Sequence, residues 1–438
     1  MVSGRAKNAP LNSRTHTFRV YSIGGQVFEP TPLETNSPEK IAGDGINAPG
    51  SCLPSRRPIA SQGALVSKPS SSPPKRLCVP CRLAAIGAVV AALAGGFAYT
   101  AGWLTPARLT TARIVNQLQA NAGVYPGYRR NHAKGVCVSG YFVSNGDGAE
   151  VSRAGLFDPG VITPVIGRFA IPGGNPYAPD ASVPIRSMAL LFQLKDGEQW
   201  RTGMNSVPLF PVRTPLKFFE QLVASRPDPA TGKPDPARLK AFFAANPETQ
   251  PFLAWLKANP PSSSFANAAY YSVNAFRFTN ADGQTRAVRW ATQPEAPYAP
   301  LTAAQKEDKN FLGGELEQRL KEGALRWDLI LTVAAPGDPT NDATQQWPAD
   351  RQQIDAGTLV IDHESSQAEG LCRDVNFDPT ILPAGIRPSD DPLLAARSAA
   401  YALSFNRRTH EEAQQPDLPS HPAAQPSQPD QPSNGAHS

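Results

Sequence analysis

The sequence predicts an α+β fold in which helices pack outside an antiparallel β-barrel. Its 46 prolines and 34 glycines among 438 residues are too many for a helix bundle and fit a β-rich core with long connections. Strand-like and helix-like runs alternate in blocks, in the order strands, helices, strands, helices. This order is typical of an antiparallel sheet with its helices on the outside. An apolar segment comes before this folded part.

The first 82 residues are basic and have no hydrophobic periodicity. They contain 11 Lys or Arg and 4 Asp or Glu, and they are rich in Ser, Pro, Asn and Gly. This composition predicts a disordered N-terminal region. The rest of the chain is close to neutral, which argues against a nucleic-acid partner.

Residues 83–104 form a run of 22 residues without a charged side chain. At about 1.5 Å per residue, such a helix crosses a hydrocarbon core of about 30 Å. Lys75, Arg76 and Arg82 precede it, which places the N-terminal side in the cytoplasm. The segment is either a transmembrane anchor or a signal peptide removed near residues 98–102, and its length favours the anchor. We therefore expect the remainder on the periplasmic side of the inner membrane.

The folded domain is predicted over residues 105–410. Runs rich in β-branched and aromatic residues, bounded by Gly or Pro, predict strands at Val136–Val143, Pro164–Ile171, Met188–Leu194, Tyr270–Phe278, Thr285–Ala291 and Trp327–Val333. Helices are predicted at Thr214–Ala224, Pro236–Ala245, Thr249–Ala258, Ala303–Glu322 and Pro392–Asn406. The Gln-Pro and Ser-Pro repeats of residues 411–438 predict a disordered tail.

The five cysteines do not form a recognisable framework. Cys78 and Cys81 make a lone CxxC without a second pair, which is a weak signal for a metal or redox site. Cys137 and Cys372 lie in apolar or strand-like surroundings. We expect them to be buried thiols, since a disulfide between them would require an oxidising compartment.

Histidine is scarce, and three of its six positions lie in the predicted disordered ends. His132, His363 and His410 remain as candidates for proton transfer. His132 stands out because Arg129 lies three residues before it and Gly135 three residues after it, with Gly-Tyr-Phe following at 140–142. This segment resembles the distal histidine strand of the haem catalases.

Further segments carry the same resemblance. Arg168, in Pro-Val-Ile-Gly-Arg-Phe, matches the catalase strand whose arginine pairs with a haem propionate. Asn205 and Phe210, in Gly-Met-Asn-Ser-Val-Pro-Leu-Phe, match the distal asparagine and the phenylalanine beside the haem, with one extra residue before the proline. Near the C-terminus, Arg397 and Tyr401 lie one helical turn apart.

The C-terminal segment is similar to the proximal helix of the haem catalases. It includes Gly-Ile-Arg-Pro-Ser at 385–389, Arg397, Tyr401 and, seven residues later, Arg408. The resemblance covers residues 112–408 and is to the catalase-related peroxidases, a shortened form of the superfamily. It implies a haem whose iron is bound by Tyr401, with Arg397 supplying the positive charge that favours a phenolate.

The resemblance also implies roles for the other matched residues. His132 would move the peroxide proton, Asn205 would hold the peroxide by a hydrogen bond, and Phe210 would keep the site apolar. The haem propionates would be bound by Arg129, Arg168 and Arg408.

Two positions depart from the family pattern. The serine or threonine that supports the distal histidine is replaced by Ala170, so we expect that support to be lost unless another group supplies it. The proline after the proximal tyrosine is replaced by Ala402. We also expect the long N-terminal arm and the C-terminal additions of full catalases to be absent.

The expected function is reduction of organic hydroperoxides with an external electron donor. A hydrogen peroxide catalase is the first alternative. A fatty-acid hydroperoxide isomerase and a non-enzymatic haem carrier are the others. The sequence predicts a peroxide substrate and a membrane contact through residues 83–104, and it identifies neither the donor nor the oligomeric state.

Overall fold

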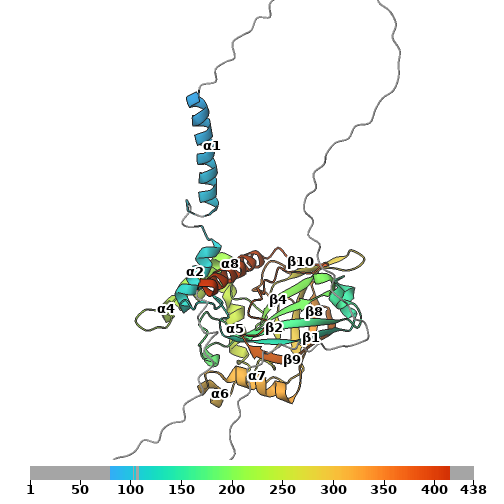
Figure 1. Cartoon of the computed structure of the whole chain (residues 1–438). Coiled ribbons are helices and arrows are strands. Elements are labelled where there is room, and N and C mark those ends of the chain that lie inside the picture. Colours follow the sequence, from blue (N-terminus) through green and yellow to red (C-terminus); the bar gives the residue numbers. More distant parts are fainter. Residues whose placement is uncertain (1–78, 102, 105–107, 415–438) are drawn as a thin grey trace, which may run out of the picture. The chain divides into compact units, whose positions relative to one another are not determined.

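The computed structural model describes residues 79–101, 103–104 and 108–414 (Figure 1). The predictions for residues 1–78 and 415–438, including Cys78 and the histidines of both ends, lie outside this part of the chain. Within it, strands and helices follow the predicted order of blocks.

Eight antiparallel strands close into a barrel. They are β1 (Gly135–Ser144), β2 (Ile162–Ala170), β3 (Ser187–Gln193), β4 (Gln199–Asn205), β5 (Tyr270–Tyr271), β7 (Thr285–Pro294), β8 (Leu325–Val333) and β9 (Gln353–Ser366). Around the barrel the order is β7-β5-β4-β3-β2-β1-β9-β8, and pairing of β8 with β7 closes the ring. On the edge of β7 that also pairs with β5, β6 (Phe276–Thr279) pairs with the first residues of β7, and β10 (Ile386–Pro388) pairs with β6.

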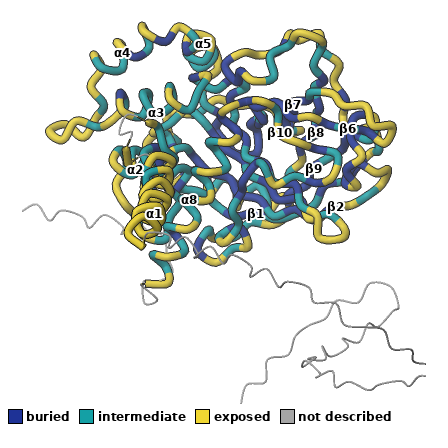
Figure 2. The backbone as a smooth tube through the Cα atoms, turned by 90° about the horizontal axis from the view of Figure 1, so that it is seen from above, coloured by how far each residue is buried: buried dark blue, intermediate teal, exposed yellow. Residues whose placement is uncertain are grey.

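Aromatic side chains fill the barrel core. Trp200, Trp327, Phe142 and Phe169 are fully buried or nearly so, and Figure 2 shows the strands as the most buried part of the backbone. The Trp327 indole nitrogen donates a hydrogen bond to the Ala268 carbonyl at 3.2 Å. This contact satisfies the buried N–H of Trp327, whereas the indole nitrogen of Trp200 is buried without a hydrogen-bond partner in the described structure.

The helices lie outside the barrel, as predicted. They are α2 (Thr111–Ala122), α3 (Pro215–Ala224), α4 (Pro236–Ala245), α5 (Gln250–Ala258), α6 (Ala303–Glu307), α7 (Phe311–Glu322) and α8 (Pro392–Gln414). In Figures 1 and 2, α2, α4 and α8 gather on one side of the barrel. Helix α3 begins after a Thr214 cap with proline in its first turn, a combination that favours helix initiation.

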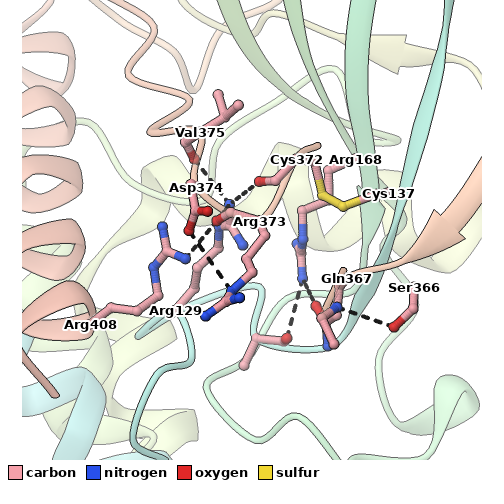
Figure 3. Close-up of a disulfide and its surroundings, with 12 residues drawn as sticks. Arg129, Cys137, Arg168, Ser366, Gln367, Cys372, Arg373, Asp374, Val375 and Arg408 are labelled. Atoms are coloured by element: carbon pink, nitrogen blue, oxygen red, sulfur yellow. Dashed lines mark hydrogen bonds and ion pairs between the residues drawn. A yellow bond between two sulfur atoms is a disulfide. The ribbon is translucent and has the colours of Figure 1, made fainter. Parts of the chain in front are cut away.

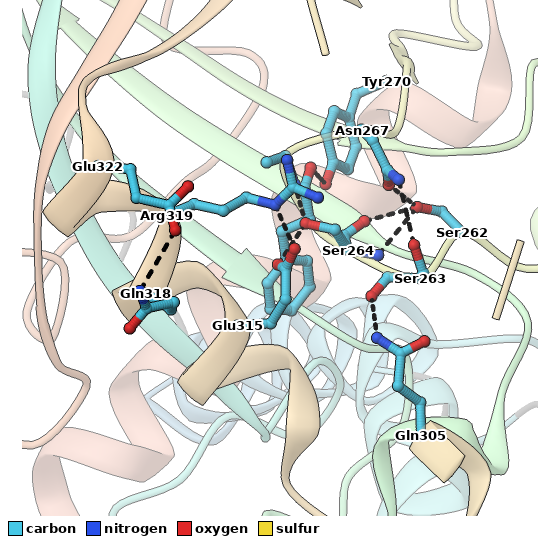
Figure 4. Close-up of polar contacts among 12 residues, drawn as sticks. Ser262, Ser263, Ser264, Asn267, Tyr270, Gln305, Glu315, Gln318, Arg319 and Glu322 are labelled. Carbon is cyan, nitrogen blue, oxygen red and sulfur yellow. Dashed lines mark hydrogen bonds and ion pairs between the residues drawn. The ribbon is translucent and has the colours of Figure 1, made fainter. Parts of the chain in front are cut away.

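A polar network fixes the long connection between α5 and β5 (Figure 4). The Ser264 hydroxyl donates to Glu315 of α7, and the Gln305 side chain donates to the Ser263 carbonyl at 3.0 Å. The Tyr270 hydroxyl donates to the Phe265 carbonyl at 2.7 Å. Buried polar groups must find partners, and these contacts satisfy them while tying α6 and α7 to the barrel.

Several predicted boundaries differ from the structure. The single strand predicted at 270–278 is divided into β5 and β6, and the helix predicted at 303–322 is divided into α6 and α7. Helix α8 continues to Gln414, four residues beyond the predicted end of the domain at 410. The extension forms because Glu411 pairs with the buried guanidinium of Arg130.

The expectation that Cys137 and Cys372 are separate thiols is wrong. They form a disulfide between β1 and the segment that follows β9, with a Cα–Cα distance of 5.3 Å. The two positions are 235 residues apart in sequence, and only the closed barrel brings them together.

The apolar N-terminal segment forms helix α1 (Val79–Thr100), which begins four residues before the predicted start at 83. Its most apolar stretch of 18 residues has a mean hydropathy of 1.8, and no residue of the helix is buried. By length and composition the helix could be a signal sequence or a membrane anchor.

Candidate active site

All eight residues singled out from the sequence line one cavity of about 220 Å³. Its walls come from α2, α3, α8 and the barrel strands β2 to β4. The eight residues are Arg129, His132, Arg168, Asn205, Phe210, Arg397, Tyr401 and Arg408. The remaining lining is mostly apolar, and among all the lining residues there are five arginines and no Asp or Glu. The cavity therefore suits an apolar ligand that carries negative charge.

His132 lies in a bend just before β1. Its φ angle of 55° is in the left-handed region, which non-glycine residues rarely adopt. The Asn131 side chain stabilises this bend, because its Oδ1 accepts hydrogen bonds from the backbone N–H groups of His132 at 3.0 Å and Gly173 at 2.7 Å. A strained backbone therefore directs the imidazole into the cavity.

Burial and neighbouring charges keep the His132 imidazole neutral. Its pKa is lowered to about 3, mainly by burial and then by the positive charges of Arg168 and Arg397. A hydrogen bond with the Asn205 side chain acts in the opposite direction. The imidazole is therefore available as a proton acceptor at neutral pH.

A hydroxyl group stands beside the position where Ala170 replaces the family's serine or threonine. In the sheet, Ala170 pairs with Ser187, and Ser187 pairs with Asn205 on the next strand. The Ser187 hydroxyl donates a hydrogen bond to Asn205 Oδ1 at 2.7 Å. This contact fixes the orientation of the Asn205 amide at the cavity wall.

Helix α8 contributes Tyr401 and Arg397 to the cavity. The guanidinium carbon of Arg397 is 5.9 Å from the centre of the Tyr401 ring. Arg397 donates to the Gly203 carbonyl at 2.9 Å and to Asn274 Oδ1 at 2.6 Å, and Asn274 donates to Asp391 at 2.8 Å. These contacts hold Arg397 in place beside the tyrosine.

Gly203 makes this arrangement sterically possible. A Cβ atom at this position would lie 3.0 Å from the Tyr401 hydroxyl and 3.1 Å from Arg397 Nη2. Among the described residues, the Tyr401 hydroxyl has no hydrogen-bond partner. It is therefore available to a ligand in the cavity.

Three of the arginines are clustered and are hydrogen-bonded mainly by backbone carbonyls. Burial lowers the pKa of Arg129, and the charges of Arg168 and Arg408 lower it further. The pKa of Arg168 is lowered to about 9, mainly by burial, and its Nε is buried without a hydrogen-bond partner in the described structure. Because a guanidinium keeps its proton at neutral pH, this cluster is stabilised when an anion binds to it.

Gly135 gives Arg168 the space that it needs. A Cβ atom at Gly135 would lie 2.7 Å from the Arg168 guanidinium carbon and 2.2 Å from the Phe169 carbonyl oxygen. The glycine that follows the histidine segment is thus required by a close approach of the two strands.

Sequence reasoning missed several residues of the site. The buried guanidinium of Arg130 pairs with Glu411, and the backbone N–H of Arg130 donates to the Ser404 hydroxyl at 3.2 Å. Ser187 and Asn274 were also missed, because their roles depend on partners in other strands. The Arg-Arg pair at 129–130 was the one sequence signal that could have drawn attention to Arg130.

The other two candidate histidines lie elsewhere. His363 on β9 and His410 on α8 are both exposed, and neither lines the cavity. Among the described residues, no group of three or more His, Cys, Asp or Glu side chains could hold a metal ion.

Fold and cavity together define a β-barrel protein with a cationic, otherwise apolar pocket for a cofactor. A family model described as Catalase matches residues 100–435. The catalase-related peroxidase of Synechococcus elongatus is 39% identical over 329 residues, covering 75% of this chain and 95% of that protein. The catalase-related peroxidase of Mycolicibacterium paratuberculosis is 34% identical over 304 residues, covering 69% and 95%.

This chain belongs to the catalase family, and the resemblance to catalase-related peroxidases is confirmed. A catalase of Pseudomonas aeruginosa is 30% identical over 285 residues but is matched over only 55% of its length. Solved structures of a fungal and a bacterial catalase share the fold, with TM-scores of 0.60 and 0.59 at 21% and 23% identity. They cover 71% and 68% of this chain, and the matches extend over 66% and 60% of their own lengths. Family membership makes the protein an oxidoreductase of the peroxidase or catalase type and implies haem as cofactor.

Proposed function

We propose that this protein is a haem-dependent peroxidase that reduces organic hydroperoxides with electrons from an external donor. The observation that carries the proposal is the shared cavity. It brings His132 and Asn205 together with Tyr401 and the arginine cluster, although these residues are far apart in sequence. A binding protein would require the tyrosine and the arginines, whereas the histidine and the asparagine serve a reaction with peroxide.

The side chains fit a haem by their chemistry. Tyr401 would ligate the iron through its oxygen, and Arg397 would stabilise the negative charge on that oxygen. The two propionate carboxylates of haem would be bound by Arg129, Arg168 and Arg408. This binding would also give the buried Arg168 Nε a hydrogen-bond partner. When bound, haem supplies the redox chemistry that breaks the O–O bond of a peroxide.

His132 would carry the proton during this reaction. Its neutral ring nitrogen accepts the proton from the hydroperoxide oxygen, and it then donates that proton to the departing oxygen, so that an alcohol leaves. The Asn205 Nδ2 group donates a hydrogen bond that orients the peroxide. Ser187 holds the amide in this orientation, which supports the assignment of donor and acceptor.

The substrate class follows from the cavity and from the relatives. Phe210, Phe218 and Leu118 are among its apolar lining residues, and they would favour the hydrocarbon part of an organic hydroperoxide. The two relatives matched over 95% of their length are named catalase-related peroxidases. A hydrogen peroxide catalase is the second candidate, supported by the catalases at 28–30% identity.

We also propose a location on the periplasmic side of the membrane. The disulfide between Cys137 and Cys372 supports an oxidising compartment, and α1 supports export through a signal sequence or anchor. Extraction of membranes with alkaline carbonate would separate these two alternatives. An anchored chain stays with the membrane, and a chain whose signal has been removed is released at a lower mass.

The test is a comparison of two activities in the haem-loaded full chain. Consumption of cumene hydroperoxide is measured with and without a reducing donor, and oxygen release from hydrogen peroxide is measured in parallel. The proposal expects turnover of cumene hydroperoxide that depends on the donor and only slow oxygen release. Rapid oxygen release without use of cumene hydroperoxide would support the catalase. Conversion of a fatty-acid hydroperoxide without a donor would support an isomerase, and no reaction at all would leave a carrier.

A further inference from the structure

One short segment of the chain holds the whole arginine cluster. This segment, residues 366–375, begins at the last residue of β9 and is called the capping segment. Arg129 Nη2 donates to three of its carbonyls, those of Cys372 at 2.8 Å, Arg373 at 3.3 Å and Val375 at 3.0 Å. The direction of the Arg129 guanidinium is therefore set by the capping segment.

The other two arginines of the cluster contact the same segment. Arg408 Nη1 donates to the Arg373 carbonyl at 2.6 Å, and Arg168 Nη2 donates to Gln367 Oε1 at 2.6 Å. Figure 3 shows these contacts converging on the segment from β2, α8 and the loop before β1. A displacement of the segment would therefore remove hydrogen bonds from all three arginines, and Arg168 would keep only its bond to the Ala133 carbonyl at 3.2 Å.

The capping segment is fastened to the barrel by the Cys137–Cys372 disulfide. Cys137 lies within β1. The backbone carbonyl of Cys372 is one of the three that accept hydrogen bonds from Arg129. Gly370 allows the segment to approach, because a Cβ there would lie 2.8 Å from Cys137 Sγ and 2.5 Å from Cys137 Cβ. The remaining internal contacts of the segment are turn hydrogen bonds such as Gly370 N–H to the Ser366 carbonyl at 2.7 Å.

Repulsion within the cluster opposes this arrangement. Arg129, Arg168 and Arg408 carry like charges close together in a cavity whose lining contains no carboxylate. The nearby Asp374 is 72% exposed, and solvent screens its charge. Glu412 of α8 pairs with Arg373 of the capping segment at 3.7 Å and offsets part of the repulsion at Arg408. The carbonyls of the capping segment therefore have to be kept in position by a covalent or packing constraint.

We propose that the Cys137–Cys372 disulfide is a positioning element for the arginine cluster, and that tight retention of a carboxylate-bearing ligand depends on it. The inference rests on the proposed function in that the ligand is taken to be haem. Reduction by a dithiol delivers two electrons and two protons, breaks the S–S bond and leaves two thiols, while the dithiol becomes a disulfide. The capping segment is then free to move, and the three guanidinium groups lose their alignment with the two carboxylates.

The experiment uses the haem-loaded full chain and measures the rate of haem transfer to excess apomyoglobin. Three proteins are compared, each with and without dithiothreitol. They are the wild type, the double variant Cys137→Ser/Cys372→Ser, and a control with Ser at Cys52, Cys78 and Cys81. We expect at least tenfold faster haem loss from the double variant, and from the wild type and the control only after reduction.

A second ligand separates positioning from a general loss of stability. Haem dimethyl ester has no free carboxylates, so its loss should be changed less than twofold by the same substitutions. Equal acceleration for haem and its ester would overturn the proposal, and so would equal rates of haem loss from the double variant and the wild type.

Two further measurements keep the outcome decisive. If the double variant does not fold, reduction of the folded wild type gives the answer, with hydrogen exchange of residues 366–375 showing whether the segment is released. Haem retention that depends on the disulfide without peroxidase turnover would support the inference and contradict the proposed function. Peroxidase turnover, together with haem retention that does not change when the disulfide is removed, would support the proposed function and contradict the inference. If the oxidised wild type bound no haem, both the proposed function and the inference would be overturned.

Discussion

The guanidinium of Arg397 lies over the ring of Tyr401, with its carbon 5.9 Å from the ring centre, one turn earlier on α8. Asn274 and the Gly203 carbonyl fix it there. Both residues line the cavity, so the pair is held where a bound ligand would meet the Tyr401 hydroxyl.

The variant Arg397→Gln tests this relationship. Without the positive charge, we expect the ferric absorption bands of the haem-loaded protein to shift and haem to be lost faster. Arg407→Gln is a matched control, because Arg407 lies on the same helix and donates to Asn116 at 2.8 Å, outside the cavity. Identical spectra for both variants and the wild type would remove Arg397 from the account.

Removal of the His132 imidazole should separate cofactor binding from reaction. In His132→Ala the haem should remain bound, while the rate of reaction with cumene hydroperoxide falls by about 10²–10⁴-fold, the usual contribution of a positioned acid–base group. Stopped-flow absorbance measures this rate. His363→Ala, which alters an exposed histidine of β9, should react like the wild type. An unchanged rate in His132→Ala would exclude its role in proton transfer.

The lowered pKa of His132 predicts a dependence of stability on pH. The unfolded chain binds the proton near pH 6.5, whereas the folded chain binds it only near pH 3. Between these values the unfolded state holds more protons, so the stability due to neutral His132 is complete above about pH 6.5 and is lost as the pH falls. The slope is at most about 1.4 kcal/mol per pH unit.

Chemical unfolding of the haem-free protein measures this effect. The wild type should lose more free energy of unfolding than His132→Gln between pH 6.5 and pH 4, since the other titrating groups are common to both. Parallel curves for the two proteins would show that His132 titrates normally in the folded state.

Ser187→Ala tests the orientation of Asn205. Loss of the 2.7 Å hydrogen bond to Oδ1 costs about 1 kcal/mol, which corresponds to about a fivefold slower reaction with hydroperoxide. Ser187→Thr keeps the hydroxyl and should recover most of the rate. If both variants reacted as fast as the wild type, Asn205 would not depend on Ser187.

The barrel and its outer helices could be predicted because they depend on local composition and on the order of elements. The interruptions could not be predicted in this way. The strand predicted at 270–278 is divided where Val273 takes a φ of 51° and Asn274 turns toward Arg397 and Asp391. A β-branched residue rarely adopts this conformation, and nothing in the sequence around Val273 indicates a break in the strand.

The site was predicted to the extent that short motifs carry it. The segments around His132 and Tyr401 matched a known pattern, and the structure places both residues at one cavity. The partners that hold these residues come from distant positions. The disulfide between Cys137 and Cys372 and the carbonyls that receive Arg129 depend on barrel closure, and neither composition nor spacing indicates them.

The most direct measurement for the central claim is the ferric absorption spectrum of the haem-loaded wild type beside that of Tyr401→Phe. The substitution removes the Tyr401 hydroxyl, which is the proposed iron ligand, and leaves the aromatic ring in place. We expect shifted bands and faster haem loss in the variant. The same spectrum and the same retention in both proteins would contradict the central claim.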